Sequence, residues 1–153
     1  VKIIEKSKKI KFPSKINPST KTFQALRIFV NKEITELMNG MVNATKYLKP
    51  GGKIIVVTFH SIEDKIVKFF FKNFLKNKSN PSRYLPEENS DNLALFENYV
   101  NKIIRPTKEE IRDNNPSRSA KLRFAVRSKN NFSYPNIFYQ KFNKYLRIEA
   151  YNV

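Results

Sequence analysis

Hydrophobic residues recur at helical spacing from Thr20 to Leu48, the first long patterned stretch of the chain. Ser19 or Thr20 can cap its start, and Lys49-Pro50-Gly51 ends it. The spacing predicts one long helix, bent or interrupted, with Gly40 as the weakest point. The apolar positions that carry this pattern are Phe23, Leu26, Val30, Ile34, Leu37, Met41 and Leu48.

A run of β-branched residues follows Gly51-Gly52, from Lys53 to Phe59. Such a continuous run is typical of a strand buried on both faces, so we expect a central parallel strand covered by helices. The next segment, Ser61 to Leu75, is predicted to be helical, with Ser61 and Asp64 as a capping pair. Helix, glycine turn, buried strand and helix together indicate an α/β protein.

Shorter elements are predicted in the second half of the chain. The segment 121–127 alternates polar with apolar residues, as a half-exposed strand does, and is expected to pair antiparallel with another late strand at a sheet edge. In chain order we expect a surface loop over 77–98, a strand over 99–104, a short helix from Thr107 to about Asp113, a loop over 114–119, the strand 121–127, and an amphipathic helix built on Phe138, Phe142 and Tyr145.

The net charge of the chain indicates a class of binding partner. The chain has 30 Lys and Arg against 13 Asp and Glu, a net charge of +17. RNA or DNA is therefore the first partner to consider and an anionic membrane the second, although coding bias toward Lys, Asn, Ile and Phe is an alternative source of the excess. With 13 Phe and 7 Tyr the chain is too apolar for a disordered tail. Residues 1–19 are interpreted as a basic arm, solvated or facing a polyanion.

Three counts exclude classes of site. The chain has no Cys and one His, which excludes disulfides, zinc–thiolate sites and metal sites with two His ligands; we expect no metal. Its three glycines cannot form a phosphate-cradling or dinucleotide-binding loop. Its longest apolar run is far shorter than the ~20 residues of a membrane-spanning helix, so we expect no membrane contact and a cytoplasmic location.

Candidate chemistry lies at His60, just past the predicted strand and just before a helix. Ligands of open α/β sheets bind outside the carboxyl ends of strands, so His60 is either a functional group there or a residue that only ties the turn. The segment 115–123 brings Arg118, Lys121 and Arg123 close together along the sequence. They are either phosphate contacts or a solvated basic face. Lys21 and Arg27 form a similar patch at the start of the long helix.

Four blocks of sequence resemble the bacterial 16S ribosomal RNA cytosine-N4 methyltransferases, the RsmH or MraW family. No single block is specific, but the four occur in the order and at intervals similar to those of the family, over roughly residues 10 to 127. This chain departs from the usual family residues at Asn17, Lys21, Thr58 and Ile62. The blocks are 17–31 (NPSTKTFQALRIFVN), 49–53 (KPGGK), 58–68 (TFHSIEDKIVK) and 115–123 (NPSRSAKLR).

The resemblance implies a Rossmann-like class I S-adenosylmethionine-dependent methyltransferase, of which this chain is the C-terminal portion. Residues 1–19 would end an inserted helical RNA-recognition subdomain or form a linker, 20–127 would complete the methyltransferase sheet, and 128–153 would be a C-terminal tail. The cofactor loop would lie outside this chain, which agrees with the glycine count. The substrate would be the N4 amine of a cytosine in 16S ribosomal RNA, with the small ribosomal subunit as partner.

Combining resemblance and residues, we expect Phe59 and His60 to line the target-base pocket, where the flipped cytosine must be held for in-line attack on the sulfonium methyl group. Phosphate contacts are expected at Lys21, Arg27, Arg118, Lys121 and Arg123. The alternatives are a non-catalytic basic RNA- or ribosome-binding module and a methyltransferase with another target. The chain alone is expected to be inactive and to expose apolar faces of helix 20–48 and strand 53–59.

Overall fold

The structure is a computed structural model that describes residues 3, 19–75 and 94–151. Most of the predicted basic arm over 1–19 and most of the predicted loop over 77–98 lie outside these residues. The chain divides into two compact units. One contains Met38–Phe142 and the other contains residues 1–37 and 143–153, and each is described by itself. No helix among the described residues is long and apolar enough to cross a membrane.

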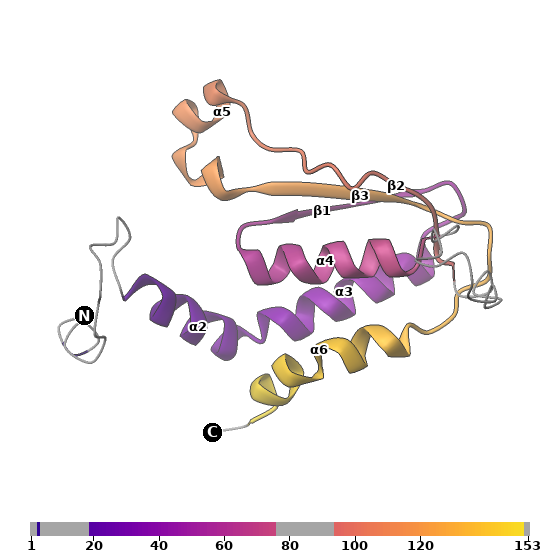
Figure 1. Cartoon of the computed structure of the whole chain (residues 1–153), viewed down its shortest axis with the longest axis horizontal. Helices are drawn as coiled ribbons and strands as arrows, with labels where there is room; N and C mark the ends of the chain where they lie inside the picture. Colours follow the sequence, from indigo (N-terminus) through magenta and orange to yellow (C-terminus); the bar gives the residue numbers. More distant parts are fainter. Residues whose placement is uncertain (1–2, 4–18, 76–93, 152–153) are drawn as a thin grey trace, which may run out of the picture. The chain divides into compact units, whose positions relative to one another are not determined.

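A three-stranded sheet forms one layer of the Met38–Phe142 unit (Figure 1). Its strands are β1 (Lys53–Thr58), β2 (Phe96–Tyr99) and β3 (Lys121–Arg127), in the order β1-β3-β2. Both outer strands are antiparallel to β3, and therefore parallel to each other. Gly51, with a φ of 80°, makes the turn that leads into β1 and donates its N–H to Arg127.

The sheet corrects the expectation for the first strand. β1 is an edge strand of the described sheet and pairs antiparallel, and alternate residues of it are exposed. The expected antiparallel pairing of the two late strands is confirmed, but the first of them is Phe96–Tyr99 and not 99–104. Ile104 instead forms an isolated bridge with Leu122.

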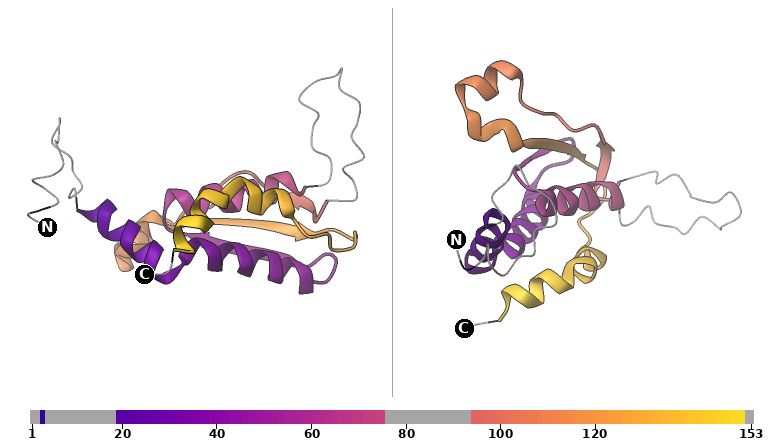
Figure 2. Two further views of the ribbon diagram at one scale, coloured as in Figure 1. Left: turned by 90° about the horizontal axis from the view of Figure 1, so that it is seen from below. Right: turned by 60° about the vertical axis from the view of Figure 1, so that its left-hand side comes forward.

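Helices cover one face of the sheet within this unit. α4 (Ser61–Asn73) buries the predicted apolar stripe, and α3 (Glu33–Tyr47) adds Met38, Met41 and Val42 to the core. The views in Figures 1 and 2 show both helices on the same side of the sheet. Aromatic rings of α6 (Asn136–Glu149) pack on α4, with Phe138 and Phe70 centroids 4.6 Å apart. The predicted C-terminal amphipathic helix is confirmed.

The predicted long helix is interrupted, but at Lys32 and not at Gly40. α2 (Thr20–Asn31) ends where Lys32 adopts a left-handed conformation with a φ of 51°, and α3 begins at Glu33. Gly40 lies inside α3, which is continuous there. Lys32 stays in this conformation because its N–H bonds to two carbonyls of the last turn of α2.

Two carboxylate oxygens of Glu149 cap the start of α3, within the second unit. Oε1 accepts from the N–H of Ile34 at 3.0 Å, and Oε2 accepts from the N–H and hydroxyl of Thr35 at 2.8 and 2.6 Å. The first amides of a helix have no partner within the helix and carry partial positive charge, so a carboxylate satisfies both requirements. The last turn of α6 thereby fixes the start of α3.

Candidate functional site

The candidate site is the edge of the sheet where β1 ends. Thr58, the last residue of β1, lies opposite Lys121, the first residue of β3, and its hydroxyl donates to the Lys121 carbonyl at 3.3 Å. Between β2 and β3 the chain forms the predicted short helix α5 (Lys108–Asp113), whose N-cap is Thr107, and the 3₁₀ helix η2 (Asn115–Ser119), where the sequence had indicated a loop. This edge is where open α/β sheets bind ligands.

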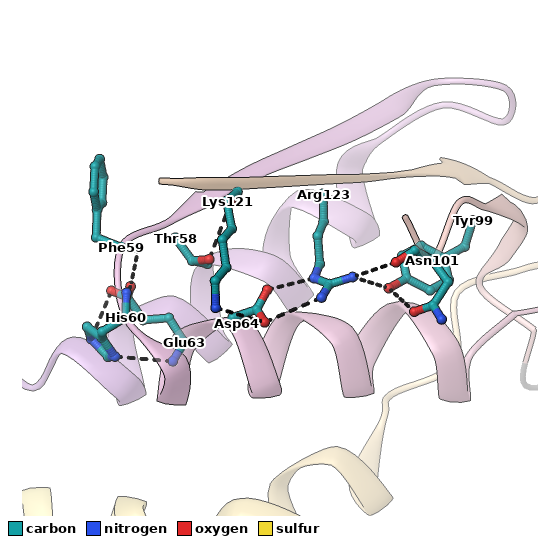
Figure 3. A network of polar contacts seen from close by, with 9 residues as sticks. All are labelled: Thr58, Phe59, His60, Glu63, Asp64, Tyr99, Asn101, Lys121 and Arg123. Carbon is teal, nitrogen blue, oxygen red and sulfur yellow. Dashed lines mark hydrogen bonds and ion pairs between the residues drawn. The ribbon is translucent and has the colours of Figure 1, made fainter. Parts of the chain in front are cut away.

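His60 is the N-cap of α4, a role that the sequence reading had given to Ser61. The Nδ1 atom of His60 accepts from the N–H of Glu63 at 3.4 Å, and the Glu63 carboxylate accepts from the N–H groups of Phe59 and His60 at 2.9 and 3.2 Å (Figure 3). This is a capping box, shifted by one residue from the predicted pair. The His60 side chain is 8% exposed, with Nε2 3.3 Å from Glu63 Oε1. Its ring therefore ties the turn between β1 and α4.

Phe59 precedes this cap and is exposed to 55%. Figure 3 shows its ring and the His60 ring pointing in different directions. The two side chains that were expected to line one pocket are adjacent in sequence, yet only Phe59 offers an accessible ring. Such a ring is a surface on which a nucleobase can stack.

Asp64 pairs with two cations of β3 across the face covered by α4. Its carboxylate lies 2.7 Å from Nε of Arg123 and 3.5 Å from Nζ of Lys121. Burial raises the pKa of Asp64, but hydrogen bonding and charge from Arg123, and then from Lys121, outweigh it and hold the pKa below its ordinary value. Sequence reasoning missed this network because Asp64 resembled part of a helix cap.

Arg123 is the centre of that network, with a side chain only 2% exposed. Its Nη1 atom donates to the Tyr99 hydroxyl at 2.9 Å and to the Asn101 carbonyl at 3.1 Å (Figure 3). Burial lowers the pKa of Arg123, yet the contacts with Asp64 and Tyr99 leave the pKa raised overall. A guanidinium held in this way is not placed to reach a phosphate, which differs from the role expected from the sequence.

Arg118 and Lys121 remain at the accessible edge. Arg118 is exposed in η2, and its Nη1 donates to the Asn115 side chain at 2.9 Å. Lys121 is partly exposed beside Asp64. Ser117, the residue before Arg118, is buried, and its hydroxyl has no hydrogen-bond partner among the residues described.

The other two predicted cations lie in α2, in the second unit. Lys21 is exposed, and Arg27 is exposed but pairs with Glu33, with Nε 2.8 Å from Oε1. Apolar side chains of this helix are exposed as well, namely those of Phe23, Leu26 and Val30. Within its unit, α2 therefore presents both charge and an uncovered apolar stripe.

The glycines show whether the described residues fit a nucleoside cofactor. Gly51 and Gly52 form the turn at the amino end of β1, against the backbone of Arg127, and Gly40 lies within α3. None of them is at the carboxyl edge of the sheet, where a glycine-rich loop would approach the cofactor. The described part of the chain therefore places no glycine-rich loop where it could approach S-adenosylmethionine.

The sequence matches the model of the MraW methylase family over residues 1–128. It is 48% identical over 118 residues to "Ribosomal RNA small subunit methyltransferase H" of Agrobacterium fabrum, covering 77% of this chain and 34% of that protein. Proteins with the same name are 50% identical over 113 residues in Ehrlichia canis (71% and 33% covered) and 52% identical over 109 residues in Ehrlichia ruminantium (71% and 34% covered). The chain thus spans about a third of the length of these relatives.

The α/β arrangement and the family match together define the class of protein, which has the class I S-adenosylmethionine-dependent methyltransferase fold. The chain belongs to the MraW methylase family. The resemblance inferred from the four sequence blocks is thereby confirmed.

Proposed function

We propose that this chain is the C-terminal portion of an enzyme that methylates the N4 amine of a cytosine in 16S ribosomal RNA, with S-adenosylmethionine as donor. The observation that carries the proposal is 48–52% identity, over more than two thirds of the chain, to proteins named as small-subunit ribosomal RNA methyltransferases. In this proposal residues 20–127 complete the methyltransferase domain and 128–153 form a tail, which agrees with a family match that ends at residue 128. Ribosomal RNA as substrate implies a cytoplasmic enzyme.

The chemistry requires that the cytosine be held in place while its amine loses a proton. The N4 lone pair is delocalised into the ring, so orientation toward the methyl group and an acceptor for the amine proton both lower the barrier. We assign Phe59 to the first task, because its exposed ring at the end of β1 can stack on an unstacked base. His60 and Glu63 are positioning residues that hold the Phe59 backbone.

Substitutions at His60 can distinguish contact of its imidazole ring with the substrate from its role as the N-cap of α4. In the complete enzyme, His60→Asn should retain most activity because Asn is a good N-cap, whereas His60→Ala should lose the cap and raise KM with it. Phe59→Ala should lower kcat/KM by about tenfold or more, since stacking contributes about 1–3 kcal/mol per base. If His60→Asn were as inactive as His60→Ala, the ring itself would act on the substrate.

Phosphate contacts are proposed at Arg118 and Lys121 on the carboxyl edge and at Lys21 and Arg27 in α2. Arg123 is left out because it is buried against Asp64. Arg118→Ala should weaken binding to a small-subunit RNA fragment and reduce the salt slope by about one. Lys46→Ala is the matched control, because Lys46 is exposed in the last turn of α3, which leads to the amino end of β1. An equal effect of both variants would contradict the placement.

The proposal is tested by mass analysis of nucleosides from small-subunit ribosomal RNA. A strain in which the gene for the complete protein is deleted should lack N4-methylated cytidine at one position and regain it when the gene is restored. Unchanged N4-methylated cytidine would overturn the substrate assignment. RNA binding without any effect on methylation would favour the non-catalytic module instead.

A further inference from the structure

The helical spacing of apolar residues continues across the break between α2 and α3, so the sequence pattern does not require a break. In a continuous helix the N–H of Ile34 would donate to the carbonyl of Val30, four residues earlier. The N–H of Thr35 would donate to the carbonyl of Asn31 in the same way. In the structure both N–H groups donate to the carboxylate of Glu149, at 3.0 and 2.8 Å. This side chain therefore takes the place of two helical carbonyls.

The break itself is an ordered arrangement. Lys32 lies there with a φ of 51°, in the left-handed region that is unfavourable for a residue with a Cβ atom. Arg27 of α2 and Glu33 of α3 pair across the break, with Nε 2.8 Å from Oε1 and Nη2 3.2 Å from Oε2. Residues six positions apart do not face each other on a continuous helix, so this pair depends on the break.

Glu149 is the member of this arrangement that comes from outside the two helices. It is buried, and it lies in α6, beyond residue 128 where the family match ends. Its Oε2 also accepts from the Thr35 hydroxyl at 2.6 Å. Hydrogen bonds to a carboxylate are stronger than those to a neutral carbonyl, and the first amides of a helix carry partial positive charge. The carboxylate thus stabilises the broken form relative to a continuous helix, in which these amides are occupied.

The direction of α2 depends on this break. Among its described residues α2 has none that is buried, so packing in a core does not fix its direction within its unit. Lys21, one of the cations proposed to contact phosphates, lies at the end of α2 away from the break. Phosphate contacts orient a protein on nucleic acid, so they need the cation in a defined place. A change of conformation at Lys32 would swing Lys21 away from that place.

We propose that Glu149 is a positioning residue for RNA binding, which keeps α2 and α3 as separate helices and so sets the direction in which α2 presents Lys21 to RNA. Without this carboxylate, the chain from α2 to α3 becomes one continuous helix that directs Lys21 elsewhere. The inference rests on the proposed RNA substrate. It is therefore tested in two parts, of which the first needs no RNA.

The first part measures the length of the α2–α3 segment with spin labels. The full chain has no cysteine, so labels attach only at Thr20→Cys and Glu36→Cys, two exposed positions 16 residues apart. A continuous helix would separate these positions by about 24 Å, at ~1.5 Å per residue. Electron paramagnetic resonance should give a shorter distance in the labelled chain and a shift to about 24 Å when Glu149→Ala is added. An unchanged distance would overturn the proposal.

A second substitution distinguishes loss of the break from loss of the fold. In the Glu149→Ala chain, Lys32→Gly should restore the original distance, because glycine adopts the left-handed conformation without steric cost and disfavours a helix interior. Lys32→Ala is the matched control and should leave the distance at about 24 Å, because alanine favours the continuous helix. No recovery with Lys32→Gly would mean that Glu149→Ala disrupts the fold, and the proposal would be overturned.

The second part measures methylation and binding of small-subunit RNA by the complete enzyme. Glu149→Ala should raise KM for the RNA, leave kcat within about twofold and lower the salt slope of binding by about one, and Lys32→Gly should reverse these changes. Ile66→Val, which loses packing at a fully buried position of α4, is the control for stability and should leave KM unchanged.

The two parts fail in different ways. A shift in label distance with unchanged KM and salt slope would overturn the positioning role of Glu149. An increase in KM of the same size for Ile66→Val would overturn it as well, because any loss of stability would then produce the effect. A wild-type enzyme that neither binds nor methylates small-subunit RNA would overturn the proposed function, while the label distances would still decide whether Glu149 sets the break.

Discussion

Individual side chains in this protein have roles that depend on which layer they face. Arg123 and Asp64 are far apart in sequence, yet they form a nearly buried ion pair between β3 and α4. Arg127, on the same face, has backbone carbonyls and the Ser128 hydroxyl as acceptors, and burial lowers its pKa. The alternation in 121–127 correctly predicts a strand, but it does not show that the cationic side is the buried one.

The cap of α4 is a second feature that the sequence predicts only in part. The rule that Ser or Thr begins a helix favoured Ser61, because histidine is not among the preferred N-cap residues. The structure places His60 there, with Glu63 as the reciprocal partner. Asp64 is thereby free to pair with Arg123 and Lys121, a contact that only the tertiary fold brings about.

Replacing Asp64 with Asn should change how stability depends on pH. The pKa of Asp64 lies below its ordinary value of 3.8 in the folded chain. Its ionised form therefore contributes stability that is fully present above the unfolded pKa and is lost as the pH falls through the folded pKa. At pH 7 the variant should lose about 1–3 kcal/mol, because Arg123 is left without its carboxylate. Its stability should also fall less steeply than that of wild type below about pH 4.

Urea unfolding of the two proteins at neutral and acid pH measures this difference. Wild type serves as the control for the variant, since all other carboxylates are the same in both proteins. An equal loss of unfolding free energy on acidification in wild type and variant would show that the pair does not depend on the charge of Asp64.

At the scale of elements, most helices and strands follow from the periodicity of the sequence. The apolar stripe of α4, the aromatic spacing of α6 and the alternation of β3 each predict an element that the structure contains. The break between α2 and α3 was misplaced, because a lysine in the left-handed conformation leaves no signal in the sequence. The sequence predicted a central position for β1, whereas β1 lies at the edge of the described sheet. A run of β-branched residues indicates that a strand is buried, but it does not say which part of the protein buries it.

Gly40→Ala tests where the long helix is interrupted. Gly40 lies within α3, and a Cβ atom added there would meet nothing within 4 Å apart from its own helix backbone and chain neighbours. The variant should gain about 0.5–1 kcal/mol in unfolding free energy, because alanine restricts the unfolded chain and favours a helix. Circular dichroism during urea unfolding gives the change, with Gly51→Ala as the contrasting variant that should lose stability at a φ of 80°. A loss for Gly40→Ala would indicate a bend there.

Glu149→Ala tests the contact between the last turn of α6 and the start of α3. It removes the acceptor for the Ile34 and Thr35 amides and should cost about 1–2 kcal/mol. Hydrogen exchange at those two amides should become faster, while Glu149→Gln, which keeps one acceptor oxygen, should show an intermediate effect. Unchanged exchange at both amides would contradict the capping role.

At the scale of the whole molecule, the Met38–Phe142 unit holds a sheet with helices on one face and apolar residues of β1 and β3 on the other. The expectation that the chain exposes apolar faces of β1 and of the 20–48 region is met by Ile55, Val57, Phe23, Leu26 and Val30. Class of fold and family could be inferred from sequence because the four motif blocks are short and local. Which surfaces need a partner depends on strand order and register, which become visible in three dimensions only.

Methyl transfer to small-subunit ribosomal RNA tests the account most directly. Labelled S-adenosylmethionine is supplied with the RNA-containing subunit to this chain, to the unmatched part of the Ehrlichia canis relative, or to both together, and the modified nucleoside is identified by mass. We expect N4-methylated cytidine only when both polypeptides are present. Methylation by the unmatched part alone, or a stable complex of both that methylates no cytosine N4, would contradict it.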